Sequence, residues 1–282
     1  MNLDRNIYRY HQVLELLEME EDDIMDEHDQ QELEDILDNR SDDASWRRGL
    51  KSKEMLFGIE LELESRHNST SYGIVEAFPD AREGDPPIPF FERDASLDEG
   101  VEVIFPPVSP AMLKNADSYF QRAVSAVSEA EVTTECNNAG MHININRGAL
   151  TDKSAALIGA VVMSMPCKLL TAVGGRELND YCAQAELDDY AMVTDMLDYT
   201  GHDWAVEYKD TRIELRYPIG TVYYPVINRN ITFAELMIQW ACTPKARRIE
   251  KAIDAWPKFY EWLQLQETED AQSISAFLAD KA

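Results

Sequence analysis

The stretch Leu56-Phe57-Gly58-Ile59-Glu60-Leu61-Glu62-Leu63-Glu64 alternates between apolar and acidic side chains from Ile59 onward. Successive side chains point to opposite faces of a strand, so the alternation predicts a strand with three carboxylates on one face. Neighbouring carboxylates on such a face are only about 7 Å apart and repel unless water or a cation screens them. For one strand alone, a solvated sheet face or an exposed edge explains the pattern better than a binding site does.

Three later segments repeat this arrangement and are also expected to be strands. They span 100–105, 140–146 and 211–217. The last two place polar side chains on one face and apolar side chains on the other, whereas Glu102 is a lone carboxylate in the otherwise apolar segment 100–105. If the four strands pair with these faces together, one surface carries carboxylates, an imidazole and two guanidinium groups. Its members are Glu60, Glu62, Glu102, His142, Asn144, Asn146, Arg212, Glu214 and Arg216.

Helical patterns lie between and after these strands. We expect helices over 110–130, 151–173, 185–200, 232–241 and 244–266, the last with a kink at Pro257. The half-polar strands are separated by long helical connections, which favours a mixed or mainly antiparallel sheet with one wet face. The predicted fold class is α+β.

Composition narrows the class of protein. The chain has 282 residues and a net charge of -27, a sign that argues against nucleic acid and anionic membranes as partners. No window has the length and apolarity of a membrane span, and the first thirty residues lack the pattern of a secretory signal. Four scattered cysteines form neither a disulfide framework nor a C-x-x-C pair. We therefore expect a cytoplasmic protein.

Acidic residues are concentrated at the N-terminus. Residues 1–45 hold sixteen Asp and Glu against three Arg, with apolar residues at roughly helical spacing between them. We expect an acidic helical extension over 1–50 and a folded unit over 51–282, with C-terminal helices in 232–282. The extension is either a solvated helix that favours solubility or a docking helix for a protein partner, and its charge alone does not decide between them.

The polar face suits a particular chemistry. Carboxylates without cysteine select Mg²⁺ or Mn²⁺, and arginines beside them can hold phosphate oxygens by two hydrogen bonds. Together these groups are the apparatus of phosphoryl transfer, so the expected ligand is ATP with magnesium. No Walker motif, dinucleotide fingerprint, HExxH or GxSxG occurs in the sequence.

Several segments resemble the glutamine synthetase and glutamate-cysteine ligase superfamily. The segments 58–62, 138–142 and 212–216 resemble its G-x-E-x-E, GMH and R-x-E-x-R motifs. Asp94-Ala95-Ser96-Leu97 with 100–107, and Arg176 ahead of 179–182, resemble motifs of the amidoligases, a bacterial and phage branch. The resemblance covers roughly 55–225. It implies a curved, mainly antiparallel sheet like the glutamine synthetase catalytic domain, whose concave face holds ATP and two or three metals.

The resemblance also implies roles for individual residues. Glu60, Glu62, Glu102, His142 and Glu214 would hold metal, with Glu102 also near the nucleotide phosphates. Arg212 and Arg216 would contact phosphate and the transition state, and Arg176 would bind substrate carboxylate or phosphate. Asp94 is either a further ligand or a residue that fixes the loop before Glu102, and Arg176 is alternatively a surface charge.

The implied reaction joins a carboxylate to an amine through an acyl phosphate at the expense of ATP. The substrates would be a small-molecule amino acid, an amine, or a peptide or protein carboxylate, in the cytoplasm of a bacterium or of a phage's host. Two alternatives stay open: a phosphotransferase of the guanidino-kinase kind, and a catalytically silent protein of the same fold that acts in assembly or regulation through its acidic extension.

Overall fold

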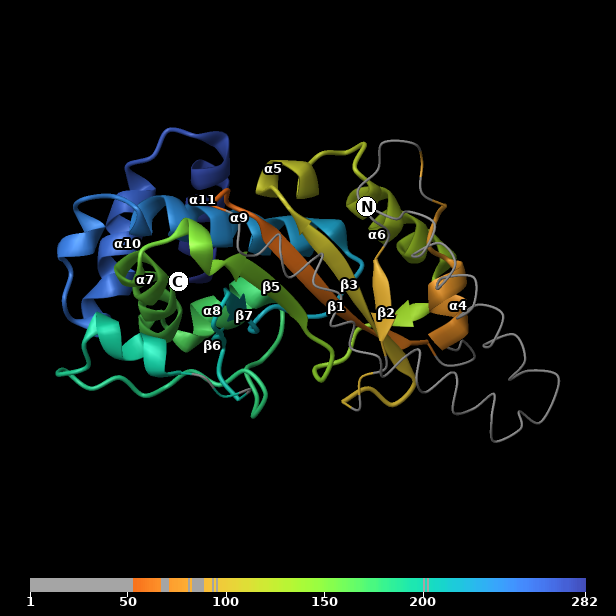
Figure 1. Cartoon of the computed structure of the whole chain (residues 1–282), viewed down its shortest axis with the longest axis horizontal. Coiled ribbons are helices and arrows are strands. Elements are labelled where there is room, and N and C mark those ends of the chain that lie inside the picture. Colours follow the sequence, from red (N-terminus) through yellow and green to blue (C-terminus); the bar gives the residue numbers. More distant parts are fainter. Residues whose placement is uncertain are drawn as a thin grey trace.

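The computed structural model describes residues 53–282 except 67–70, 81, 83–88, 93, 95, 200 and 202. The expected acidic helices over 1–50 lie outside the described residues. The chain folds into an α+β structure, as predicted, with one open sheet and flanking helices (Figure 1). One hydrophobic cluster runs from Phe57 in the first strand to Leu278 in the last helix, so sheet and helices share a core.

The sheet is built from seven strands, all paired antiparallel. The central path runs in the order β2-β3-β1-β5-β7-β6, and β4 pairs with the end of β1. The strands are β1 (Phe57–Ser65), β2 (Phe90–Glu92), β3 (Gly100–Val108), β4 (Thr133–Thr134), β5 (Met141–Asn146), β6 (Val206–Tyr208) and β7 (Arg212–Leu215). The four predicted strands form the centre of this sheet, and sequence analysis missed the short strands β2, β4 and β6.

Helices flank the sheet and fill the C-terminal half. They are α4 (Ser71–Glu76), α5 (Pro110–Leu113), α6 (Tyr119–Ala130), α7 (Asp152–Ser164), α8 (Cys167–Gly174), α9 (Tyr224–Ala241), α10 (Ala255–Gln264) and α11 (Glu269–Lys281). Short 3-10 turns are η1 (Arg147–Ala149), η2 (Val193–Asp198), η3 (Ala246–Arg248) and η4 (Ala252–Asp254). Figure 1 shows α6 and α9 behind the strands, the side on which the apolar strand residues lie in the core.

Two predicted helices are each split in two. The helix expected over 110–130 is interrupted after Leu113, and a second helix begins when Ser118 caps it by accepting a hydrogen bond from the Gln121 amide. The helix expected over 151–173 breaks at Met165, whose backbone is extended because Pro166 follows it. The helices on either side of this break diverge by 105°.

Two other helix predictions need correction. Over 185–200 we expected an α-helix, but the described residues contain only the 3-10 turn η2. Here backbone donors bond to a distant segment, as when the Val193 amide donates to Glu250 O at 2.7 Å. The expected helix over 244–266 contains two 3-10 turns before α10 begins at Ala255. Pro257 therefore lies in the first turn of α10, where its missing N–H costs no helical bond, and produces no kink.

Within the described residues no single helix has the length and apolarity to cross a membrane, and only α7 and α8, sharply bent against each other, satisfy those two criteria as a pair.

Candidate functional site

The polar face predicted from the sequence exists, and its residues come from four neighbouring strands. In β1 the apolar side chains enter the core while Glu60 and Glu62 point to the opposite face, where each is less than a tenth exposed. The strand register sets Glu62 opposite Glu102 of β3 and Glu60 opposite His142 of β5. Asn144 in turn lies opposite Glu214 of β7. The polar side chains that the four segments place on the same face therefore form one continuous surface.

His142 is the centre of the acidic part of this face. Its Nδ1 lies 3.2 Å from Glu60 Oε2 and 3.7 Å from Glu214 Oε1, and its Nε2 lies 3.3 Å from Glu62 Oε1. Burial lowers the pKa of His142, but the surrounding carboxylates outweigh this and raise it above its ordinary value. The imidazole therefore partly compensates the charge of three glutamates.

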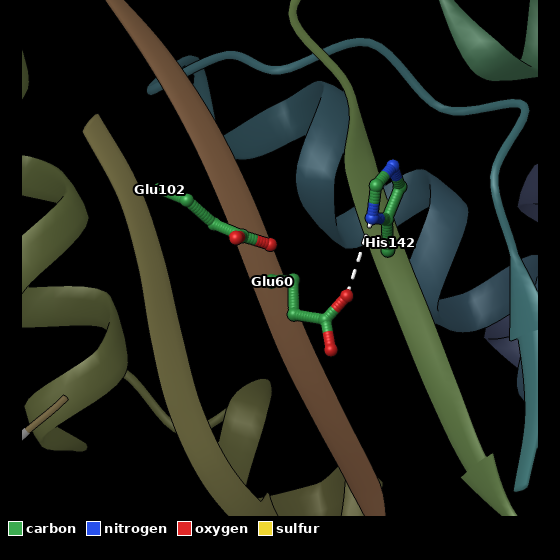
Figure 2. Close-up of side chains that lie close together, drawn as sticks. All are labelled: Glu60, Glu102 and His142. Atoms are coloured by element: carbon green, nitrogen blue, oxygen red, sulfur yellow. Dashed lines mark hydrogen bonds and ion pairs between the residues drawn. The ribbon is translucent and has the colours of Figure 1, made fainter. Parts of the chain in front are cut away.

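Glu60, Glu102 and His142 form a group that can hold a metal ion. Each offers a ligand atom, and these atoms lie within 4.8 Å of one another. Figure 2 shows the three side chains converging from β1, β3 and β5, with helices visible behind the strands. Two carboxylates and one imidazole are donors that suit Mn²⁺, and the carboxylates suit Mg²⁺. The donor chemistry of these three residues therefore fits the divalent cation expected from the sequence.

The carboxylates nearest this group are electrostatically crowded. Burial and the neighbouring charges of Glu60, Glu62, Asp94 and Glu92 raise the pKa of Glu102 to about 9. Burial likewise raises the pKa of Glu62, although His142 and a hydrogen bond from the Gly140 amide act against the increase. Among the described residues no lysine or arginine forms an ion pair with Glu62 or Glu102. A bound cation would relieve the repulsion.

Glu214 has the opposite surroundings. Burial raises its pKa, but His142, Lys209 and Arg216 together lower it well below its ordinary range. Lys209 Nζ lies 2.5 Å from Glu214 Oε2, Arg216 Nη1 lies 2.5 Å from Oε1, and Arg212 Nη2 lies 3.5 Å from Oε2. Three cations thus surround one buried carboxylate. The structure places Glu214 3.7 Å from His142 but outside the three-residue group described above.

Arg212 links the two parts of the face. Besides contacting Glu214, its Nη2 lies 3.9 Å from Glu60 Oε1. Its side chain and that of Arg216 are 16% and 13% exposed. Arg216 Nε also donates to the carbonyl of Tyr181 at 3.4 Å. Arg212 therefore connects Glu60 of β1 with Glu214 of β7, and Arg216 is held beside Glu214.

Arg176 lies near the same polar face. Its contacts differ from both roles expected from the sequence, which were a substrate-binding residue and a surface charge. It is 4% exposed, so it is not a surface charge. Its Nη1 donates to the carbonyl of Ala139 at 3.0 Å, and its Nη2 donates to the carbonyl of Arg216 at 2.6 Å. Its guanidinium thereby ties the loop before β5 to the end of β7. This contact pattern fixes backbone, and a phosphate-binding role for Arg176 stays a prediction.

Asp94 lies beside the face and fixes a loop. Its Oδ1 accepts from the Ser96 amide at 2.6 Å, and its carbonyl accepts from the Leu97 amide at 3.1 Å. This is the loop-fixing role that the sequence left open. Asp94 is also close enough to Glu62 and Glu102 to raise the pKa of both carboxyls.

Sequence analysis missed Lys209 and Glu207, and gave Asn144 no role. Lys209 follows β6, a three-residue strand whose alternation is too short to recognise, yet it stands three residues before Arg212. Glu207 lies opposite Glu214 in the register. Asn144 is 1% exposed, and neither its Oδ1 nor its Nδ2 has a hydrogen-bond partner among the described residues. A buried amide without partners is costly, so a ligand that satisfies it would gain affinity.

The chain was compared with known proteins. No protein-family model matches it, and no curated protein matches its sequence. The likeness to amidoligases therefore rests on the motif residues themselves.

Proposed function

We propose that the protein is an ATP- and Mg²⁺-dependent carboxylate-amine ligase. The observation that carries the proposal is the separation of charge on one sheet face. Carboxylates around His142 lie over β3 and β1, and Lys209, Arg212 and Arg216 lie around β7. A cation bound by the first part and phosphate oxygens bound by the second would neutralise both parts at once.

The metal would be held by Glu60, Glu102 and His142, with Glu62 beside them. When bound, it would supply positive charge to the phosphate oxygens of ATP. Arg212 and Arg216 can each present a planar fork to phosphate, whereas Lys209 presents a point charge. Glu214 orients these cations, since it contacts all three. The buried amide of Asn144 offers two donors and an acceptor to the polar groups of a substrate.

The proposed reaction has two steps. A carboxylate oxygen of the acceptor attacks the γ-phosphorus of ATP, the bond between that phosphorus and the β,γ-bridging oxygen breaks, and ADP leaves. An amine nitrogen then attacks the acyl carbon, the carbon–oxygen bond to phosphate breaks, and the amine loses a proton. Positioning and charge neutralisation supply most of the rate enhancement, because the acyl phosphate is already activated.

A trapping experiment tests this function without knowledge of the amine. The protein is incubated with ATP, Mg²⁺, pooled amino acids and peptides, and hydroxylamine as a surrogate amine. A ligase releases ADP and forms hydroxamates, which are detected by mass spectrometry. Transfer of ¹⁸O from the labelled carboxylate into phosphate then identifies the acyl-phosphate route.

The variants Glu60→Gln and Glu129→Gln provide a matched pair. Each removes one negative charge, but Glu129 is an exposed residue of α6 that belongs to none of the strands of the polar face. We expect Glu60→Gln to abolish hydroxamate formation and Glu129→Gln to leave it unchanged. ADP release with a phosphorylated guanidino product and no hydroxamate would show that the protein is a phosphotransferase and not a ligase. Absence of metal-dependent nucleotide binding would favour the silent assembly protein.

A further inference from the structure

The turn between α9 and α10 is basic in a strongly acidic chain. Residues 245–251 contain four basic side chains against Glu250, and Lys258 follows in α10. All five basic side chains are exposed: Lys245, Arg247, Arg248, Lys251 and Lys258. Over 245–258 the net charge is +3, whereas the whole chain carries -27. This local reversal of charge sets the turn apart.

Three of these cations have no described counter-ion. Among the residues that the structure describes, Arg247, Arg248 and Lys251 form no ion pair and no side-chain hydrogen bond. Lys258 is paired with Glu261 at 3.1 Å, but both side chains are about half exposed. Neighbouring like charges repel one another. An acidic partner bound at this turn would reduce the repulsion and lower the free energy.

Exposed apolar side chains lie beside the basic turn. Tyr190 is 84% exposed, and Met192 and Ile253 are each 38% exposed. The two segments are joined through their backbones, since the Ala252 amide donates to Ala191 O at 2.8 Å. Because the exposed Asp188, Asp189 and Asp195 flank Tyr190 and Met192, we restrict the name basic patch to Ile253 and the five basic residues. A surface with both cations and apolar side chains fits an acidic segment that also carries apolar residues.

A series of contacts connects the start of the described structure with the helices that precede this patch. At the start of β1 the Leu56 amide donates to Asn146 Oδ1 at 2.8 Å, and Asn146 Nδ2 donates to Glu54 O at 2.6 Å. Asn146 leads through η1 into α7, where Ser154 Oγ donates to Ala241 O at 3.0 Å. Ala241 ends α9 and directly precedes the basic turn. Residues 39–52 span at most about 50 Å when extended, which is ample for a segment before them to reach the patch.

We propose that the basic patch binds the acidic segment 15–38 of the same molecule. That segment contains thirteen Asp and Glu and no Lys or Arg, with leucine, isoleucine and methionine residues between them. It complements the patch in charge and in apolar content, and its tether raises its effective concentration there. This inference goes beyond the ligase function and does not depend on it.

Carbodiimide cross-linking of the full chain at low concentration tests the contact directly. The reagent joins lysine amines to carboxylates that touch them. We expect Lys245, Lys251 and Lys258 to form cross-links to carboxylates within 15–38. Lys168 and Lys281, which are exposed near the C-terminus of the chain, serve as internal controls and should form few such links. Cross-links spread evenly over all five lysines would overturn the proposal.

Hydrogen exchange gives a second measurement that does not use lysine chemistry. In the wild type at low salt we expect amides in 15–38 to be protected. The triple variant Arg247→Glu, Arg248→Glu, Lys251→Glu should lose that protection by about tenfold, as expected when several surface charge contacts are removed. The matched variant Arg66→Glu, Lys168→Glu, Lys281→Glu changes charge equally at other exposed positions and should keep it.

Two outcomes would contradict the proposal. If amides in 15–38 exchange at unprotected rates in the wild type, this segment does not bind the patch. If protection grows with protein concentration and light scattering shows a dimer, the segment binds a second copy and not its own molecule. Since all substituted residues are exposed, an unchanged circular dichroism spectrum shows that the variants remain folded.

Discussion

Glu102 and Glu214 lie on the same sheet face but differ in electrostatic surroundings. Glu102 is crowded by carboxylates, and its pKa of about 9 leaves its carboxyl protonated at pH 7. Glu214 is ionised and contacts Lys209, Arg212 and Arg216. Removal of one partner from a buried pair leaves an uncompensated charge, whereas removal of a repelled charge does not. Identical substitutions at the two positions should therefore have different effects.

We predict that Glu214→Gln lowers the free energy of unfolding by about 3 kcal/mol at pH 7 in chelator, the cost typical of breaking a buried ion pair. Glu102→Gln should leave it nearly unchanged, because glutamine resembles the protonated carboxyl. Urea denaturation provides the measurement. In contrast, Glu102→Gln should weaken Mn²⁺ binding by about tenfold or more, measured by calorimetry. Equal destabilisation by the two substitutions would show that their surroundings are alike in solution.

Arg216 offers a separate prediction about phosphate. Its Nη1 contacts Glu214 and its Nε contacts the Tyr181 carbonyl, so its fork is held in a fixed orientation. Lysine keeps the charge but loses the planar fork. We expect Arg216→Lys to keep the fold and nucleotide affinity while kcat and kcat/KM fall together by about a hundredfold on the substrate found by trapping. A raised KM with wild-type kcat would instead assign Arg216 to ground-state binding.

At the scale of elements, alternation in the sequence was enough to predict the four central strands and the residues on their polar face. Three of them alternate over at least four residues, the fourth carries Glu102 in an otherwise apolar run, and the shared parity of the polar residues indicated one surface. The strands β2, β4 and β6 were missed because two or three residues carry no measurable period. Lys209 and Glu207 were missed with them, since their place in the site depends on β6.

Helix predictions failed where the backbone bonds to another segment. Over 185–200 an apolar period exists, but the backbone there pairs with Glu250 and Ala252 across the chain. Such long-range pairing leaves no mark in a local window. Splits at Met165 and after Leu113 are boundary errors, and the proline at 166 accounts for the first of them. The spacing of Arg212 and Arg216 places them on the face of Glu214, whereas the contacts of Lys209 and His142 with Glu214 depend on tertiary structure that no spacing reveals.

The close packing of α7 against β6 at Gly159 can be tested by a single substitution. A Cβ added at Gly159 would lie 2.1 Å from Tyr208 Oη, whose hydroxyl donates to Ala155 O. Alanine normally stabilises a helix interior by about 1 kcal/mol relative to glycine, so propensity and packing oppose each other here. We predict that Gly159→Ala destabilises by about 1–3 kcal/mol through overpacking. Thermal unfolding provides the measurement. In the control Gly58→Ala the added Cβ would meet only ordinary contacts at 3.5 Å and beyond, so this variant should be as stable as the wild type.

Lys114 connects three helices and yields a prediction for pH. At the end of α5, its Nζ lies 2.7 Å from both Glu235 of α9 and Asp270 of α11. Burial lowers the pKa of Lys114, but these hydrogen bonds outweigh burial and raise it above 10.5. A raised folded-state pKa contributes stability that is complete below the unfolded value and is lost as pH rises through the folded value.

We therefore expect Lys114→Met to lower the Tm by about 2 °C at neutral pH, a modest effect because the pair is partly exposed. The difference from the wild type should stay constant up to about pH 10 and shrink above 10.5. Thermal unfolding across this range measures it. A difference that persists at pH 11.5 would assign the effect to lost packing of the lysine stem.

At the scale of the whole molecule, cations act in two distinguishable ways. A net charge of -27 produces repulsion that any salt screens, whereas the metal site proposed at Glu60, Glu102 and His142 would bind one divalent ion specifically. Screening depends on ionic strength and affects every variant alike. Specific binding saturates and depends on the ligands. The two effects therefore separate when Mg²⁺ is compared with NaCl at equal ionic strength.

We predict that Mg²⁺ at about ten times its Kd, measured by calorimetry, raises the Tm more than NaCl of equal ionic strength does. Linkage at ten times Kd contributes about 1.4 kcal/mol, or about 3 °C for a protein of this size. Glu60→Gln should lose this excess, while Glu129→Gln, which removes the same charge from the exposed surface of α6, should keep it. If Mg²⁺ and NaCl raise the Tm equally in all three proteins, the cations act only by screening, and the carboxylates of β1 and β3 bind no ion specifically.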